Sequence, residues 1–111
     1  MNIREVADSL SLDVKTARGD LGRTVTGCYI SDLLSDVMAN AKEGEVWITL
    51  QTHPNIVAVA SLKNLAGIII TNNRTPEEET LKKAEDEHIV LAVSPLTTFD
   101  AGGRLYTLLR C

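Results

Sequence analysis

Apolar and polar positions follow one repeating order over most of the chain. Four short apolar runs, at 25–30, 46–50, 68–70 and 89–93, each end in polar residues and precede a segment with helical spacing. Continuous apolar strands that alternate with helices are typical of parallel sheets that are covered on their faces and joined by right-handed crossovers. The pattern therefore predicts an α/β fold with a mainly parallel sheet and helices on both faces.

Cap residues mark where the predicted helices begin. Ser31-Asp32 precedes the first helix, and Pro54 suits the first helical position of the second. Thr75-Pro76 followed by Glu78 is the clearest start, that of the third helix, and Ser94-Pro95 precedes the last. The apolar positions of the first and last helices are expected to face the core; they are Leu33, Leu34, Val37, Met38 and Ala41, and Leu96, Phe99, Leu105, Tyr106 and Leu109.

The residues before the first apolar run add a helix and an edge strand. Apolar residues recur at helical spacing over 3–10, and 12–16 alternates between polar and apolar residues as an edge strand does. Residues 17–22 carry two glycines and an Asp and are predicted to form a loop. With 111 residues, of which 44% are apolar, the chain 1–111 is expected to form one compact domain.

The helix predicted after Pro54 is apolar on almost every side, because 56–60 consists of Ile, Val and Ala. Such a helix must be covered on more than one side. It is either buried within the monomer or part of a subunit interface. We expect a homodimer, in line with the second interpretation.

Charge and cysteine content argue against several classes of protein. Fifteen acidic and eleven basic residues give a net charge of −4, which repels phosphate backbones, so no nucleic-acid partner is expected. No apolar run reaches the roughly twenty residues that span a bilayer, so no membrane association is expected either. The only cysteines, Cys28 and Cys111, imply no disulfide framework, and a reducing cytoplasmic location suits them.

Polar side chains gather where the four predicted strands end. In an open parallel sheet this edge holds the ligand sites, and the helix N-termini there favour anions. The densest group is 51–55; a phosphate or carboxylate could be held there, or Thr52 could simply cap the helix that Pro54 starts. Asp32 and Asn72 likewise fit either a site or a cap or turn. The candidate ligand-binding residues are Asp32, Gln51, Thr52, His53, Asn55, Asn72 and Ser94.

Signals for catalysis and for metal binding are missing from the sequence. It contains no G-x-x-x-x-G-K-[ST] motif, and no G-x-G-x-x-G follows a predicted strand. The two histidines and two cysteines do not recur at metal-ligand spacing. Cys28 precedes a predicted helix and is better interpreted as a buried thiol than as a reactive one. We therefore predict no catalytic residue, no metal site and no cofactor.

Five segments, 25–39, 47–60, 66–70, 76–84 and 94–108, together resemble the DRTGG domain. The pattern that names this family is present in looser form, as Asp20, Arg23, Thr26 and Gly27, with Cys28 where a second Gly is expected. The resemblance implies an accessory domain of the kind found beside paired CBS modules in regulated pyrophosphatases and beside phosphotransacetylases. Single-domain members occur near hydrogenase and redox genes, which implies a redox or hydrogenase-associated protein partner. The family's most recognisable segments contain Asp32, Gln51, Thr52, His53 and Asn55.

Three functions remain, in decreasing order of support. The first is a non-catalytic regulatory or ligand-sensing domain that binds a small anionic metabolite or an adenine nucleotide at the strand ends. The second is a structural module for dimerisation or protein interaction that docks through the 56–60 helix. The third is an enzyme related to kinases or hydrolases, which the missing phosphate-binding loop disfavours.

Overall fold

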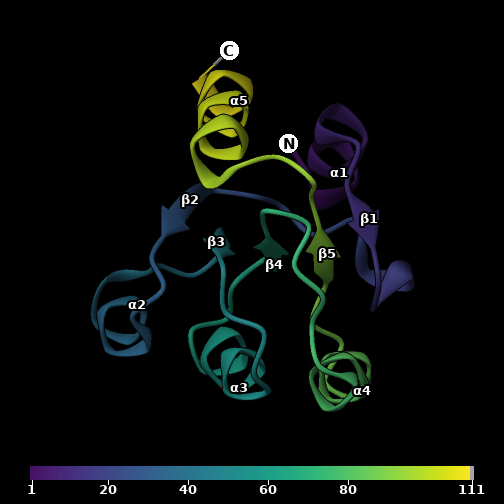
Figure 1. Ribbon diagram of the computed structural model, residues 1–111. Helices are drawn as coiled ribbons and strands as arrows, with labels where there is room; N and C mark the ends of the chain where they lie inside the picture. The colour runs from purple at the N-terminus through teal and green to yellow at the C-terminus, as the bar shows by residue number, and fades with distance from the viewer. Residues whose placement is uncertain (111) are drawn as a thin grey trace.

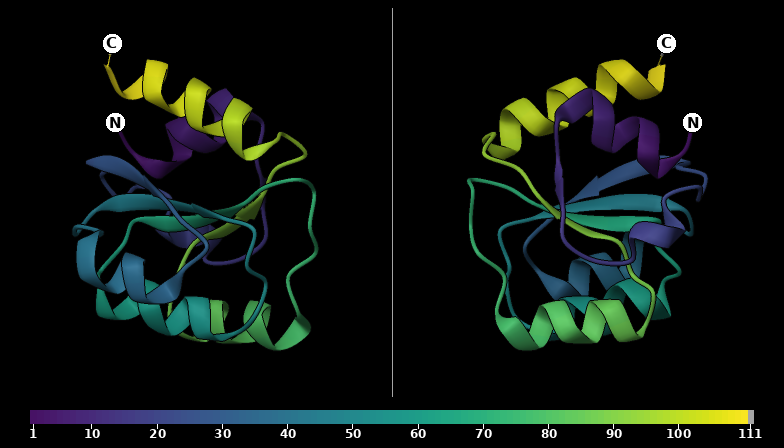
Figure 2. Two further views of the ribbon diagram at one scale, coloured as in Figure 1. Left: turned by 60° about the vertical axis from the view of Figure 1, so that its left-hand side comes forward. Right: turned by 90° about the vertical axis from the view of Figure 1, so that its right-hand side faces the viewer.

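The computed structural model describes residues 1–110 and shows three layers (Figures 1 and 2). One sheet has the strand order β1-β5-β4-β3-β2, in which β2 to β5 are parallel and β1 is antiparallel to β5. The strands are β1 (Asp13–Val14), β2 (Gly27–Ile30), β3 (Glu45–Thr49), β4 (Gly67–Ile70) and β5 (Leu91–Val93). The α-helices are α1 (Ile3–Leu10), α2 (Leu34–Asn40), α3 (Asn55–Leu62), α4 (Glu78–Asp86) and α5 (Thr98–Arg110). The predicted α/β class with its mainly parallel sheet is confirmed.

The order of the strands in the sheet determines which face each helix covers. Strands β2 to β5 lie side by side in chain order, so the three crossovers run in the same direction and α2, α3 and α4 cover the same face (Figure 1). After β5 the chain turns to the opposite face, where α5 packs beside α1. The predicted helices on both faces are confirmed, and each face of the sheet has its own core.

The central strands are buried on both sides, as a parallel sheet requires. Val46, Ile48 and Ile69 belong to the core beneath α1 and α5, whereas Trp47 and Ile68 belong to the core beneath α2, α3 and α4. Consecutive side chains thus alternate between the two cores, which is the period of two that a strand imposes. The runs look continuously apolar in the sequence because both sets of positions are buried.

Helix α3 is apolar on every side because it lies in the middle of a layer of three helices. It contacts α2 and α4 as well as the sheet. Ile56, Val57 and Ala60 are fully buried, and Val59 is 7% exposed. The interpretation that this helix is buried within the monomer is confirmed, and the alternative that it forms a subunit interface is wrong. A homodimer would need another surface.

Helix α4 begins later than its cap residues predict. The prediction placed the start directly after Thr75, with Pro76 at the first helical position, but the helix begins at Glu78. The Glu77 N–H donates to the Thr52 carbonyl oxygen at 3.3 Å, and Glu77 is in an extended conformation. A contact with the loop after β3 has therefore overridden the local capping signal.

The other helix starts also differ from the predicted caps. Helix α5 begins at Thr98, and the Thr97 hydroxyl accepts a hydrogen bond from a backbone N–H of its first turn at 3.1 Å, so Ser94 is not its cap. Helix α2 begins at Leu34 and has no side-chain cap. Helix α3 begins directly after Pro54. Pairs of residues that look like caps thus belong to loops that lead up to the helices.

Four residues that the helical spacing assigns to the core are exposed instead. Leu33 is 64% exposed, Met38 39%, Phe99 87% and Tyr106 62%. Helix α2 has only seven residues and contributes Val37 as its one fully buried side chain. Helix α5 rests on the sheet by one narrow side, so the aromatic residues on its outward side stay in solvent.

The N-terminal third matches its prediction in outline. Residues 12–16 contain only the two-residue strand β1, and the predicted loop at 17–22 contains one turn of 3₁₀ helix at Arg18–Asp20. Within residues 1–110, no helix has both the length and the apolar content that crossing a membrane requires.

Candidate functional site

The carboxyl ends of β2, β3, β4 and β5 lie along one edge of the sheet, which faces the viewer in Figure 1. Parallel pairing brings Ser31, Thr52, Asn72 and Ser94 to this edge, so the predicted common rim is confirmed. In folds of this class a ligand lies where neighbouring strands send their connections to opposite faces. Here that point is between β4, which leads to α4, and β5, which leads to α5.

The space between the ends of β4 and β5 is closed by the chain itself. Asn72 and Asn73 both have left-handed backbone conformations, and their N–H groups donate to the carbonyl oxygens of Leu96 and Ser94 at 2.8 Å each. Ser94 is fully buried, and its Oγ accepts from the Leu96 N–H at 3.1 Å. Asn72 is therefore a turn residue, and Ser94 supports the loop from within.

Asp32 and Gln51 join the ends of β2 and β3. Asp32 Oδ1 accepts from the Thr49 hydroxyl at 2.8 Å and from the Leu50 N–H at 2.7 Å. The Gln51 side-chain amide donates to the Asp32 carbonyl oxygen at 2.9 Å. The Asp32 carboxylate is thus held in one orientation by the neighbouring strand end, which explains why it does not cap α2.

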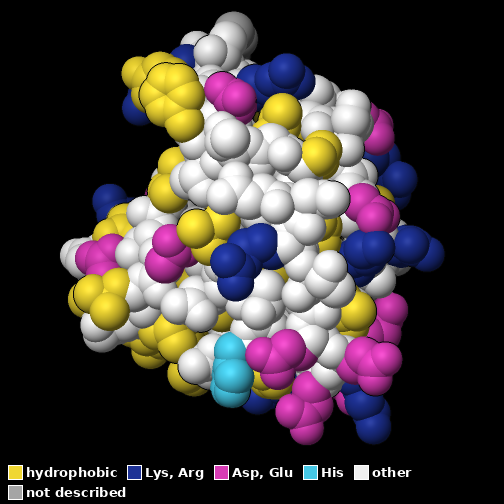
Figure 3. Space-filling model, in the orientation of Figure 1, with side chains coloured by type: hydrophobic (Ala, Val, Ile, Leu, Met, Phe, Trp, Pro, Cys, Tyr) yellow, Lys and Arg dark blue, Asp and Glu magenta, His cyan; other side chains and the backbone are white. Residues whose placement is uncertain are grey.

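A hollow of about 210 Å³ lies beside this pair and is lined by Asp32, Leu50, Gln51 and Arg74. It brings together a carboxylate, an amide and a guanidinium, groups that bind hydroxyls, amines and phosphates. Figure 3 looks onto the same edge and shows a basic side chain near its middle. The sequence did not single out Arg74, because one arginine in a polar loop has no periodicity and no motif.

The other predicted residues lie at the start of α3. His53 Nδ1 accepts from the Asn55 N–H at 3.1 Å, so the imidazole provides a partner for a backbone N–H at the start of the helix. The Thr52 carbonyl oxygen accepts from the Thr80 hydroxyl at 2.6 Å. His53 and Asn55 are exposed, and the lining of the hollow does not include these three predicted residues.

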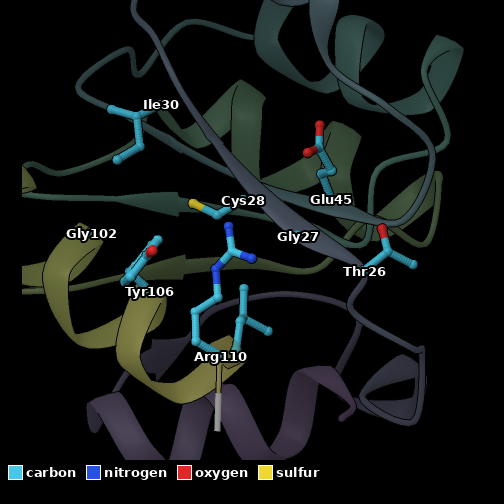
Figure 4. A pocket seen from close by; sticks show the side chains of 9 residues that line it. Thr26, Gly27, Cys28, Ile30, Glu45, Gly102, Tyr106 and Arg110 are labelled. Atoms are coloured by element: carbon cyan, nitrogen blue, oxygen red, sulfur yellow. The ribbon is translucent and has the colours of Figure 1, made fainter.

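A larger cavity of about 400 Å³ opens between β2 and α5 (Figure 4). Cys28 reaches it from β2, and Tyr106 and Arg110 reach it from α5, with Glu45 at its side. Burial, and to a smaller extent the Glu45 carboxylate, raises the pKa of the Cys28 thiol to about 12. The thiol is protonated at neutral pH, so Cys28 is an inert thiol rather than a nucleophile.

We predict that Cys28 resists alkylation in the folded protein. A pKa of about 12 instead of 9.0 lowers its thiolate fraction at pH 8 by about a thousandfold, and the thiolate is the reactive form. The measurement is the rate of iodoacetamide labelling of a Cys111→Ser variant, with the same protein in urea as the control. Because the pKa is higher in the folded chain, the protonated thiol favours folding at neutral pH, and this advantage is lost as the pH rises toward 12. Equal labelling rates in the two states would contradict the prediction.

Comparisons with known proteins support the fold. No family model and no curated protein matches the chain. A solved structure of the CBS and DRTGG domains from the regulatory region of a Clostridium perfringens pyrophosphatase is similar, with a TM-score of 0.70 and 19% sequence identity. The likeness covers 93% of this chain and 44% of the other. The chain is thus an α/β domain with a DRTGG-like fold, as the resemblance in sequence implied.

Proposed function

We propose that this chain is a non-catalytic regulatory domain that binds a small anionic ligand in the hollow lined by Asp32, Gln51 and Arg74. The observation that carries the proposal is the Arg74 guanidinium at the carboxyl edge of the sheet, next to a carboxylate and an amide that neighbouring strand ends hold in place. Arginine binds phosphate and carboxylate groups through two parallel hydrogen bonds. The basic group gives the edge an anchor for an anion in a chain whose net charge is −4.

The ligand class that we favour is an adenine nucleotide. Arg74 would bind a phosphate, while the Asp32 carboxylate and the Gln51 amide would accept hydrogen bonds from sugar hydroxyls. A volume of about 210 Å³ is below the roughly 300–1,000 Å³ of sites that enclose a whole ligand. The hollow would therefore hold the sugar and one phosphate, with the base outside it. The similar pyrophosphatase region was solved with an activator, diadenosine tetraphosphate, which supports testing nucleotides first.

Thermal denaturation with AMP, ADP, ATP, diadenosine tetraphosphate, acetyl phosphate and inorganic phosphate tests the proposal. At a ligand concentration of 100 times Kd, we expect stabilisation of about 2.7 kcal/mol. Arg74→Gln should weaken binding by about tenfold or more, because it removes a charge-assisted hydrogen bond. Arg4→Gln, which changes an exposed arginine of α1, is the matched control and should bind as the unchanged protein does.

Two outcomes would refute this function. The first is that none of the six compounds stabilises the protein at millimolar concentration. The second is stabilisation that Arg74→Gln and Arg4→Gln leave equally intact, since the ligand would then bind elsewhere. Phosphorus NMR of the protein mixed with the nucleotide distinguishes binding from turnover. If the nucleotide were slowly converted, and if Arg74→Gln abolished this conversion, the protein would be an enzyme instead.

A further inference from the structure

The side of α5 that faces away from the sheet carries a row of exposed residues, two of which, Tyr106 and Arg110, also border the cavity between α5 and β2. Phe99, Gly103, Tyr106 and Arg110 follow one another at steps of four, three and four residues, which places them on one side of the helix. Phe99 is 87% exposed and Tyr106 62%. The Arg110 guanidinium lies 4.9 Å from the centre of the Tyr106 ring. We call these four residues the α5 row; Figure 3 shows apolar side chains protruding at the upper left, where α5 lies.

No contact among residues 1–110 requires a glycine at position 103. A Cβ added there would meet nothing within 4 Å, and its backbone is not in the left-handed region. A glycine inside a helix costs about 1 kcal/mol relative to alanine. Gly102 differs, because its Cβ would come within 2.8 Å of Ile30 Cδ1, so a larger residue there would require the half-exposed Ile30 side chain to shift. A glycine between two exposed aromatic residues instead suits the close approach of another backbone from outside.

The α5 row is suited to a second copy of itself. Phe99 and Tyr106 are seven residues apart, and the Gly102-Gly103 pair lies midway between them. If two α5 helices pack antiparallel about a two-fold axis at the glycines, Phe99 of each copy meets the partner's Tyr106, and the glycines let the helices approach closely. One row then covers the other completely, which is the condition for a closed two-fold dimer.

Charges beside the row fit the same arrangement. Asp100 and Arg104 lie on one flank of α5, four residues apart. The two-fold axis that pairs Phe99 with the partner's Tyr106 also places Asp100 beside the partner's Arg104, and it does so twice.

We propose that the chain forms a homodimer through the α5 row, with the two α5 helices antiparallel. This inference does not depend on the proposed ligand. Phe99 and Tyr106 are 87% and 62% exposed and would bury roughly 200–400 Å² per copy. The half-exposed Ile30, which lines the cavity together with Tyr106, adds to this area. A standard interface buries about 800 Å² per partner, so the dimer belongs to the weaker class. It also brings an aromatic side chain of the partner next to the cavity of Figure 4, whose lining includes Ile30, Gly102 and Tyr106.

Sedimentation equilibrium of the full chain from micromolar to millimolar concentration tests the oligomeric state. We expect the mass to rise to that of a dimer, and Phe99→Asp to weaken association by about tenfold or more, as loss of a central aromatic anchor does. Leu62→Asp is the matched control, because Leu62 is 74% exposed on α3, on the opposite face. A monomer at every concentration, or a dimer that Leu62→Asp breaks and Phe99→Asp leaves intact, would overturn the proposal.

Disulfide trapping tests the antiparallel register. In a Cys28→Ala, Cys111→Ser background, Phe99→Cys and Tyr106→Cys are made as separate proteins. The mixture of the two should form cross-linked dimers at least tenfold faster than either protein alone, because each cysteine faces the other position in the partner. Rates that are equal for the mixture and for each protein alone would reject the register.

Discussion

Replacing Trp47 by alanine is expected to lower the free energy of unfolding by about 3–5 kcal/mol. Trp47 is fully buried in β3, a central strand, and belongs to the core beneath α2, α3 and α4. Its indole N–H also donates to the Ser31 carbonyl oxygen at 2.8 Å, where β2 ends. The alanine variant therefore loses the largest side chain of the core and leaves a partly buried carbonyl group without its donor. Urea denaturation followed by circular dichroism measures the loss, since Trp47 is the only tryptophan available for fluorescence.

Trp47→Phe separates the contribution of core packing from that of the hydrogen bond to Ser31. It keeps an aromatic ring in the core but cannot donate to Ser31, so a smaller loss of about 1–3 kcal/mol is expected. If the alanine variant lost less than about 1 kcal/mol, the core of this face would have to be far more adaptable than close packing allows.

Replacing Thr16 by valine should lower the free energy of unfolding by about 2–4 kcal/mol, although the side chains have nearly the same volume. Thr16 is 2% exposed. Its hydroxyl donates to the Ile89 carbonyl oxygen at 2.7 Å and accepts from the Leu91 N–H at 3.0 Å. Valine leaves both buried backbone groups without partners. Chemical denaturation gives the magnitude, and faster hydrogen exchange of the Leu91 amide locates the effect.

Thr16→Ser is the control for this second substitution. Serine keeps the hydroxyl and loses one methyl group, so a loss of about 1 kcal/mol is expected. A larger loss for serine than for valine would mean that packing of the methyl group, more than the two hydrogen bonds, holds the N-terminal segment to β5.

The strands and the class of the sheet were predictable because burial on both faces produces apolar runs that local pattern reveals. The predicted runs at 46–50 and 68–70 match β3 and β4 within one residue. The strand order was not predictable, because no local pattern states which strands are neighbours. The expected rim could still be derived, since it requires only that the four strands be parallel.

The errors share one physical cause, which is that contacts between distant segments override local signals. Thr75 looks like a cap, but the contact of Glu77 with Thr52 holds the preceding chain extended. Asp32 looks like a cap as well, but Thr49 and Leu50 bind its carboxylate. Helical spacing placed Phe99 in the core because it identifies positions that share a side of a helix without stating which side faces solvent.

The candidate site was only partly predictable for a related reason. Asp32 and Gln51 were found because they follow strands, and strand ends can be recognised in the sequence. Arg74 lies in the loop after β4 and comes beside them only because β4 pairs with β3. Ser94 and Asn72 follow strands too, but the chain uses their polar groups for its own loops.

Because α1 and α5 pack against each other, the start of α1 and the end of α5 lie at one corner of the molecule (Figures 1 and 2). If such a module were inserted into a longer protein, the chain would enter and leave the module at neighbouring points. The flanking segments of the host would not be pushed apart, and joining the two ends would need only a short linker. The same geometry makes this fold easy to place between other domains without rebuilding either neighbour.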